Sequence, residues 1–322
     1  MDWLDKTKSV LIGKAYELGG SQLAQQAEIE NLQKIWSRVY NECYPRSMSD
    51  PYIDPQSGVL RNRFGLADQK SLDLAEANSV SVRSILLQLN PLKGNFDSEH
   101  LKAIHAYLFR DVYEWAGQFR TIALAKAEDV RGGRIIRFTP PDLIERELKH
   151  VFDELADEHF LEGLPRREFA RKIAALFSEI NRIHPFREGN GRAQRQFVRQ
   201  LADSLGFKLH FEVVSKERLI QASILSANGD VAMMERLFDE ITDTERIQSL
   251  AKVIAHLERG QFKWNDVYLA TTTSGRSYAG TFAGSDGANF FFRDDENRIL
   301  VGNLKDLKRA AESGEKISFT AS

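Results

Sequence analysis

The chain has 322 residues, with 44 Lys and Arg against 46 Asp and Glu, which gives a formal net charge of -2. This balance excludes a wholly basic binder of nucleic acid or anionic membranes, because no global positive charge attracts such partners. The single cysteine, Cys43, excludes an intramolecular disulfide framework and a Cys-rich zinc site, and it is typical of a reducing compartment.

The first fifty residues are predicted to form an N-terminal helical extension, residues 1–50. Apolar residues recur there at helical spacing, and a turn-rich stretch at 44–51 ends the segment. No basic and then apolar leader is seen, and no window approaches the 18 consecutive apolar residues of a membrane helix. We therefore expect a cytoplasmic protein without a membrane partner.

The stretch from about Asp68 to Leu257 has an almost continuous helical pattern. Within it, a helix capped by Asp97 is predicted to run to Gly117. Further helices are predicted after 140–142, from about 166, from about 190, and over 216–227, 232–241 and 244–257. This pattern predicts a mainly α fold, in which residues 51–257 form one helical domain.

Two regions favour β structure instead. Residues 130–138 predict a small hairpin, with Gly132-Gly133 at the turn and β-branched residues after it. Strands are also predicted over 267–273, 277–282, 289–292 and 299–301. They indicate a small β-rich module at 258–322, for which a partial barrel of the OB type is one form. Such modules can bind nucleic acid, but core packing explains the Phe290–Phe292 run as well, and we expect no nucleic-acid partner.

The most informative stretch runs from His184 to Arg195 and reads His-Pro-Phe-Arg-Glu-Gly-Asn-Gly-Arg-Ala-Gln-Arg. It lies between two predicted helices. Gly189 and Gly191 allow the backbone to approach a ligand closely, and amides at a helix N-terminus form a nest for anions. Arg192 shares a helix face with Arg195. Two guanidinium groups beside such a nest are suited to a polyphosphate.

The same stretch contains an acid and a base. Glu188 suits Mg²⁺, which typically takes one or two protein oxygens together with phosphates and waters. His184 can take up a proton near neutral pH. Arg187 is expected to lie in solvent. The set predicts a nucleoside triphosphate, a metal ion and a general base, with a target hydroxyl attacking a phosphorus atom.

At these residues the sequence resembles the Fic family, whose signature is H-x-F-x-[D/E]-G-N-G-R-x-x-R. Every specified position is matched. The resemblance extends from about residue 50 to 257: residues 109–117 resemble the family's helix before its flap, and 130–139 fall where its β-hairpin flap would be. It implies that residues 51–257 form a Fic-type helical bundle.

The resemblance also implies an activity, the transfer of AMP from ATP to a Ser, Thr or Tyr hydroxyl of a target protein with release of pyrophosphate. His184 would be the catalytic base, Glu188 would hold Mg²⁺, and Phe186 would anchor the loop in the core. Phosphate binding is implied for Gly189, Asn190, Gly191, Arg192 and Arg195. Target binding by β-augmentation is implied for the flap residues Ile135, Ile136, Arg137 and Phe138, with Ile136 and Phe138 as side-chain clamps.

Several alternatives stay open at this point. The loop does not distinguish ATP from UTP or GTP, and another nucleotidyl or phosphoryl transferase on the same scaffold is one alternative. A non-catalytic interaction protein is another, which the intact His184 and Glu188 oppose. The family's inhibitory motif, [S/T]-x-x-x-E-[G/N], is absent from the sequence. Either a second chain supplies it, or restraint is absent or differently built, and our hypothesis is a small inhibitory antitoxin protein in trans. A Fic domain followed by a β module also resembles effectors exported by type IV secretion, so the chain is either a fragment of a longer effector or a toxin that acts in its own cell.

Overall fold

The computed structural model describes residues 50–127 and 135–322, so the predicted helical extension before residue 50 lies outside the described residues. The chain divides into two compact units, one of residues 1–160 and 179–201 and one of residues 161–178 and 202–322. The domain boundaries predicted at residues 50 and 257 stay predictions. In the described part of the chain, none of the helices is both long enough and apolar enough to pass through a membrane.

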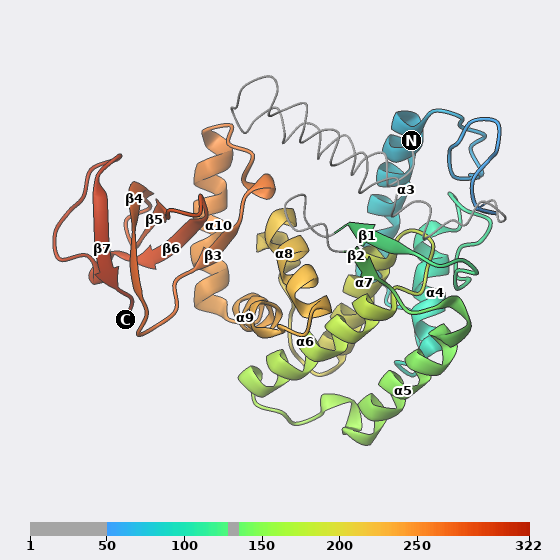
Figure 1. Ribbon diagram of the computed structural model, residues 1–322. Helices are drawn as coiled ribbons and strands as arrows, with labels where there is room; N and C mark the ends of the chain where they lie inside the picture. The colour runs from blue at the N-terminus through green and yellow to red at the C-terminus, as the bar shows by residue number, and fades with distance from the viewer. Residues whose placement is uncertain (1–49, 128–134) are drawn as a thin grey trace. The chain divides into compact units, whose positions relative to one another are not determined.

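The first unit is built mainly from helices (Figure 1). They are α3 (Gln69–Leu89), α4 (Ser98–Phe109), α5 (Ile144–Asp157), the end of α6 (Arg166–Ile183) and most of α7 (Asn190–Ser204). Asp68 and Asp97 cap α3 and α4 by accepting hydrogen bonds from amides of the first turn, which that turn leaves without helical partners. The predicted cap at Asp97 is confirmed.

Helix α4 ends at Phe109, so the predicted end at Gly117 is wrong. The amides of Val112 and Tyr113 both turn back to the Phe109 carbonyl, at 2.8 and 2.9 Å. The Tyr113 ring then stacks on Trp115, with ring centroids 4.3 Å apart. Val112 and Trp115 continue the helical spacing of apolar residues and are buried, but they lie in a succession of turns. Burial alone therefore does not distinguish the two conformations.

A hairpin is present as β1 (Ala125–Ala127) paired antiparallel with β2 (Ile135–Arg137), so its second strand lies within the predicted range of 130–138 and its first strand lies before it. Its predicted turn at Gly132-Gly133 lies outside the described residues. The Phe138 amide extends the pairing by donating to the Leu124 carbonyl at 3.2 Å. After it, Pro140 precedes a short 3-10 helix, η1 (Pro141–Leu143), which leads into α5.

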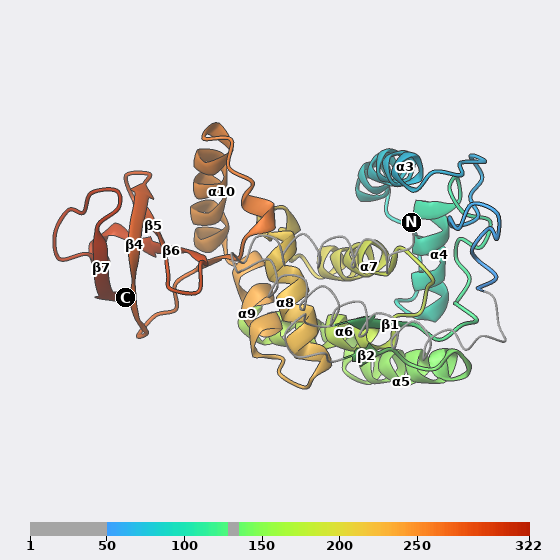
Figure 2. The same ribbon diagram turned by 45° about the horizontal axis from the view of Figure 1, so that its top comes forward.

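The second unit combines most of α6 with three further helices and a sheet. The helices are α8 (Lys216–Ala227), α9 (Ala232–Ile241) and α10 (Thr244–Arg259), and the strands are β3 (Leu269–Thr271), β4 (Ser277–Ser285), β5 (Asn289–Arg293), β6 (Ile299–Asn303) and β7 (Lys316–Thr320). The strand order is β3-β6-β5-β4-β7, with β3 and β6 parallel and the other pairs antiparallel. Helix α10 contacts β3 and β6 and lies beside the sheet in both views (Figures 1 and 2).

The mainly α fold with a small C-terminal β module is therefore confirmed. Its sheet is open, with β3 and β7 at the two edges. The strand β7 is not among the predicted strands. Phe290, Phe291 and Phe292 are at most 3% exposed. Phe290 and Phe292 belong to the hydrophobic core of the module, so core packing accounts for them.

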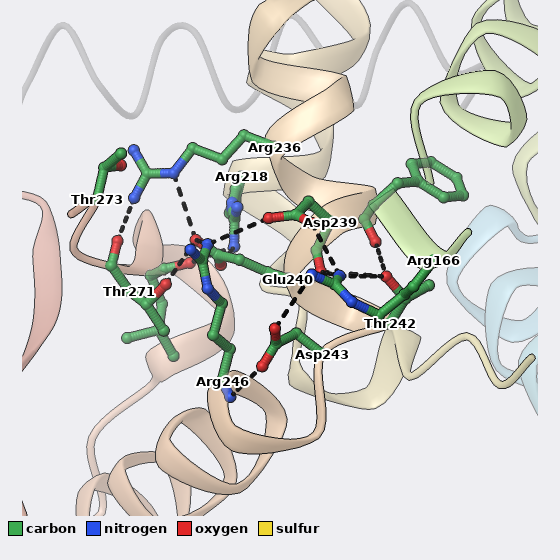
Figure 3. Close-up of polar contacts among 12 residues, drawn as sticks. Arg166, Arg218, Arg236, Asp239, Glu240, Thr242, Asp243, Arg246, Thr271 and Thr273 are labelled. Carbon is green, nitrogen blue, oxygen red and sulfur yellow. Dashed lines mark hydrogen bonds and ion pairs between the residues drawn. The ribbon is translucent and has the colours of Figure 1, made fainter. Parts of the chain in front are cut away.

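A buried ion network fastens β3 to the helices of the same unit (Figure 3). Glu240 of α9 pairs with Arg218 of α8 at 2.6 Å and with Arg236 at 3.3 Å, and it accepts a hydrogen bond from the Thr271 hydroxyl of β3 at 2.8 Å. Burial by itself raises the pKa of a carboxyl group. Here Arg218 and Arg236 outweigh the burial and hold the pKa of Glu240 below its usual value.

Candidate active site

The motif occupies the loop between α6 and α7 and the first turns of α7. His184 directly follows α6 and has φ 52°, a left-handed conformation that is uncommon for residues other than glycine. Gly189 has φ 83°, and a Cβ atom there would lie 2.3 Å from the Phe109 ring. The backbone at this position therefore requires glycine, both for its dihedral angle and for its close approach to α4.

Phe186 and Asn190 hold the loop from inside. Phe186 is 1% exposed and stacks on His105 of α4, with ring centroids 3.8 Å apart. The Asn190 amide group accepts a hydrogen bond from the Phe186 backbone N–H at 2.8 Å and donates one to the Phe186 carbonyl at 2.7 Å. The Asn190 side chain is thus occupied by hydrogen bonds within the loop. The backbone N–H of Asn190 stays available for a ligand.

Backbone amides are available at the start of α7. Among the described residues, the N–H groups of Asn190 and Gly191 have no acceptor, whereas those of Arg192 and Ala193 donate to the Gly189 carbonyl at 3.1 and 3.0 Å. The two free amides lie at the positive end of the helix dipole, where an anion is stabilised.

Two carboxylates hold the guanidinium of Arg192. It lies 2.6 Å from Glu76 of α3 and 3.3 Å from Glu188. Burial opposes the charge on this side chain, but the two carboxylates outweigh the burial and raise the pKa of Arg192. Glu76 also accepts a hydrogen bond from the Tyr113 hydroxyl. Glu76 was not found from the sequence, because α3 has no motif that points to it.

Arg195 has a different environment. None of the carboxylates in the described part of the chain pairs with it, and burial together with the positive charges of Arg192 and Arg199 lowers its pKa to about 10. An incoming anion relieves this unfavourable environment by supplying negative charge and hydrogen-bond acceptors. The structure therefore places a cation short of counter-charge on the same helix as the free amides.

Glu188 is the acid at this loop. Its side chain is 32% exposed, and its carboxylate is shared with Arg192. The described residues contain no group of three or more His, Cys, Asp or Glu side chains that could enclose a metal ion by themselves. A single accessible carboxylate nevertheless fits Mg²⁺ when phosphate oxygens and waters complete the shell.

The flap residues lie at different depths. Ile136 is half-buried, Arg137 is exposed, and Ile135 is placed here only by its backbone pairing with Ala127. Phe138 is 9% exposed and stacks on the imidazole of His184, with ring centroids 3.9 Å apart and planes 10° from parallel. The Phe138 side chain is thus directed at the predicted base.

Arg187 is buried, so the expectation that it lies in solvent is wrong. It is 5% exposed, and its guanidinium donates to Asp50 through Nε at 3.0 Å and Nη2 at 2.9 Å. Both bonds end on Oδ2 of Asp50, and this ion pair ties the start of the described chain to the motif loop. Its partner is 137 residues away in the sequence, so no local pattern reveals the pairing.

His105 supports the loop from α4. Its Nδ1 accepts a hydrogen bond from the Gly117 amide at 2.8 Å, so its Nε2 carries the proton and donates to the Glu188 carbonyl at 2.9 Å. Burial, and after it the charge of Arg192, lowers the pKa of His105 to about 3. The imidazole is therefore neutral and holds one tautomer.

This depressed pKa predicts a pH-dependent stability. An unfolded histidine titrates at about 6.5, so the stabilisation is complete above that pH and is lost as the pH falls towards 3. Between pH 7 and 5 we expect His105 to account for a loss of about 2 kcal/mol in the free energy of unfolding. Urea unfolding of the wild type and of His105→Gln over this range measures the difference. Equal pH slopes in the two proteins would contradict the assignment.

The comparisons with known proteins agree with this geometry. The sequence matches the Fic/DOC family over residues 95–202. It is 32% identical over 192 residues to a relative from Escherichia coli named "Probable protein adenylyltransferase Fic", of which it covers 92%. The chain therefore belongs to the Fic/DOC family. A protein from Bartonella henselae named "Protein adenylyltransferase" is 32% identical over 283 residues, which are 84% of this chain and 52% of that protein.

Solved structures give the same result. The type IV secretion system effector protein BepA superposes with a TM-score of 0.75 at 31% identity, over 84% of this chain and 95% of that one. The N-terminal Fic domain of a Bartonella quintana effector, solved with bound ADP, has a TM-score of 0.56 at 31% identity over 62% of this chain and 99% of that one. The chain spans about half the length of the first curated relatives it matches, 52% and 44%.

Proposed function

We propose that this protein is an adenylyltransferase that moves AMP from ATP to a Ser, Thr or Tyr hydroxyl of a target protein. The observation that carries the proposal is the arrangement at the start of α7, where Arg195 lacks a carboxylate partner among the described residues and lies on the same helix as two free amides. Relatives named protein adenylyltransferases and a related Fic domain with bound ADP support this reading.

In this mechanism the target hydroxyl oxygen attacks the α-phosphorus of ATP. The bond from that phosphorus to the bridging oxygen of the β-phosphate breaks, and pyrophosphate leaves. His184 accepts the hydroxyl proton on its imidazole, while Arg192, Arg195 and the amides of Gly189, Asn190 and Gly191 neutralise the phosphate charge. Glu188 would hold Mg²⁺, whose contribution when bound is to neutralise phosphate oxygens.

Target recognition belongs to the hairpin. We propose that Ile135, Ile136, Arg137 and Phe138 present the edge of β2 to an extended segment of the target, which adds as a further strand. The half-buried Ile136 and exposed Arg137 are available for this contact. The buried Phe138 would act on the target through its stacked partner, His184.

Restraint of the activity is proposed to come from a small antitoxin protein in trans. The motivation is that the 322-residue sequence lacks the family's inhibitory motif. A glutamate of residues 1–50 paired with Arg195 would contradict it. We further propose action in a cytoplasm, either of the cell that makes the protein or of one that receives it, and the relative BepA, a type IV secretion effector, supports export.

Labelled ATP distinguishes the proposed reaction from its rival. Incubation of the protein with a lysate and Mg²⁺ is expected to label a protein band from α-labelled ATP and leave it unlabelled from γ-labelled ATP. Label from the γ-position alone would make the protein a phosphoryl transferase on the same scaffold. Competition by unlabelled UTP or GTP in the same assay identifies the base that the site accepts.

A further inference from the structure

Arg120 is a buried arginine at the base of the hairpin that is bonded to carbonyl oxygens. It is 2% exposed. Its side-chain donors reach the carbonyls of His184 at 2.8 Å, Ile122 at 2.7 Å, Thr139 at 2.5 Å and Ile183 at 3.2 Å, and its backbone N–H reaches that of Pro185 at 2.8 Å. Arg120 thus donates hydrogen bonds to five carbonyl groups.

These carbonyls belong to two parts of the first unit. Ile122 precedes β1 and Thr139 follows β2, so they flank the hairpin on both sides. The others come from the end of α6 and the first residues of the motif loop. The planar guanidinium has five N–H donors in a fixed fork and can serve several acceptors at once, which the compact ammonium of lysine does not do in the same geometry.

The end of α6 needs such a partner. The last carbonyls of a helix have no helical donor and carry the negative end of the dipole, so a buried cation there is favourable. His184 follows directly in the left-handed conformation that glycine usually adopts at a helix end. A non-glycine residue persists in this conformation where its surroundings hold it.

The backbone and the side chain of His184 are both held by groups next to the hairpin. Arg120 donates a hydrogen bond to the His184 carbonyl oxygen, and the ring of Phe138, which directly follows β2, stacks on the imidazole with centroids 3.9 Å apart. The Phe138 amide is itself bonded to Leu124, on the other side of the hairpin. The orientation of the imidazole is therefore tied to the position of the hairpin base.

We propose that Arg120 is a positioning residue for His184. The guanidinium group of Arg120 couples the β1–β2 hairpin to the motif loop. The proposal rests on the proposed function, since it assigns the coupling a role in setting the base for proton transfer from a target bound at the hairpin. A displacement of the hairpin base moves Ile122, Thr139 and Phe138, and Arg120 transmits that displacement to the backbone of His184.

Two substitutions separate the fork from the charge. Arg120→Lys keeps a cation but loses the fork, and Arg120→Met loses both. We expect Arg120→Met to lower kcat for AMP transfer by about 10²-fold, the effect of misplacing a catalytic group by roughly 1 Å, and Arg120→Lys to fall between it and the wild type. The affinity for ATP is expected to stay unchanged, because none of the five carbonyls that Arg120 bonds belongs to a residue assigned to the phosphates. Rates are expressed per nucleotide-binding site, so unfolded protein is not counted.

The matched control is Arg218→Lys, which changes a buried arginine of α8 that has no part in the loop. It is expected to lower the thermal unfolding temperature and leave kcat per site unchanged. An unchanged kcat in both Arg120 variants would overturn the proposal. A parallel loss of ATP affinity and kcat would overturn it as well, since that pattern indicates a general structural defect.

A second measurement stands apart from activity. Hydrogen exchange in Arg120→Met is expected to accelerate together at the amides of Phe138 in the hairpin and His184 in the loop. Acceleration at one without the other would overturn the coupling. If the wild type transfers no AMP at all, the proposed function fails, while the exchange measurement still decides whether Arg120 joins the two segments.

Discussion

His184→Ala is expected to lower the rate of AMP transfer by about 10²- to 10⁴-fold, the usual contribution of a positioned general base. Without the imidazole, the hydroxyl proton of the target loses the acceptor proposed for it as the nucleophile attacks. ATP binding is expected to persist, because the phosphate ligands assigned here are the arginines and amides of α7. Transfer is measured with α-labelled ATP, and binding by equilibrium titration with the nucleotide.

The control for this variant is His150→Ala. His150 lies on α5 with a side chain that is 72% exposed, so the same chemical change is made away from the loop. Its transfer rate should equal that of the wild type. A His184→Ala protein that binds ATP and still transfers AMP at the wild-type rate would remove His184 from the mechanism.

Glu240→Leu is expected to destabilise the second unit by about 3–5 kcal/mol, because it leaves the fully buried Arg218 without its counter-ion. The double variant Arg218→Met/Glu240→Leu should be considerably more stable than that single variant, since both buried charges are then removed. Urea unfolding followed by circular dichroism gives the free energies, and the cycle of variants isolates the coupling between the two side chains.

Glu245→Gln is the matched surface change for this experiment, because Glu245 is exposed in the first turn of α10. It should alter the free energy of unfolding by less than about 0.5 kcal/mol. If Glu240→Leu costs no more than this control, or if the double variant loses the sum of the two single losses, the buried Arg218–Glu240 pair does not stabilise the second unit.

The parts of the fold that are predicted correctly from the sequence are mostly set by local patterns of caps, turns and apolar spacing. Both α8 and α9 have the predicted bounds, because a cap or turn adjoins each amphipathic run: Ser215 caps α8 and the Asn228-Gly229 turn follows it. The end of α4 was misplaced because buried apolar residues continue at helical spacing into the turns. Strand β7 was missed because it is a short run with one buried side chain, and its pairing with β4 is what defines it.

The candidate site also has a part that the sequence predicts, the motif residues, and a part that it does not, the residues that support them. The motif residues are contiguous and chemically distinctive, so His184, Glu188, Arg192 and Arg195 are identified from the sequence, and the structure brings them to one loop and helix start. Their supports come from elsewhere in the first unit. Glu76, His105 and Arg120 act through contacts with residues more than sixty positions away, and nothing in their immediate neighbourhood distinguishes them from ordinary surface or core residues.

The proposed chemistry is tested most directly by the mass of a target protein after incubation with this protein, ATP and Mg²⁺. We expect a gain of one AMP group on a Ser, Thr or Tyr hydroxyl with the wild type, and no gain with His184→Ala. A gain of a phosphate group in place of AMP, or an equal gain of AMP with His184→Ala, would contradict the proposed chemistry.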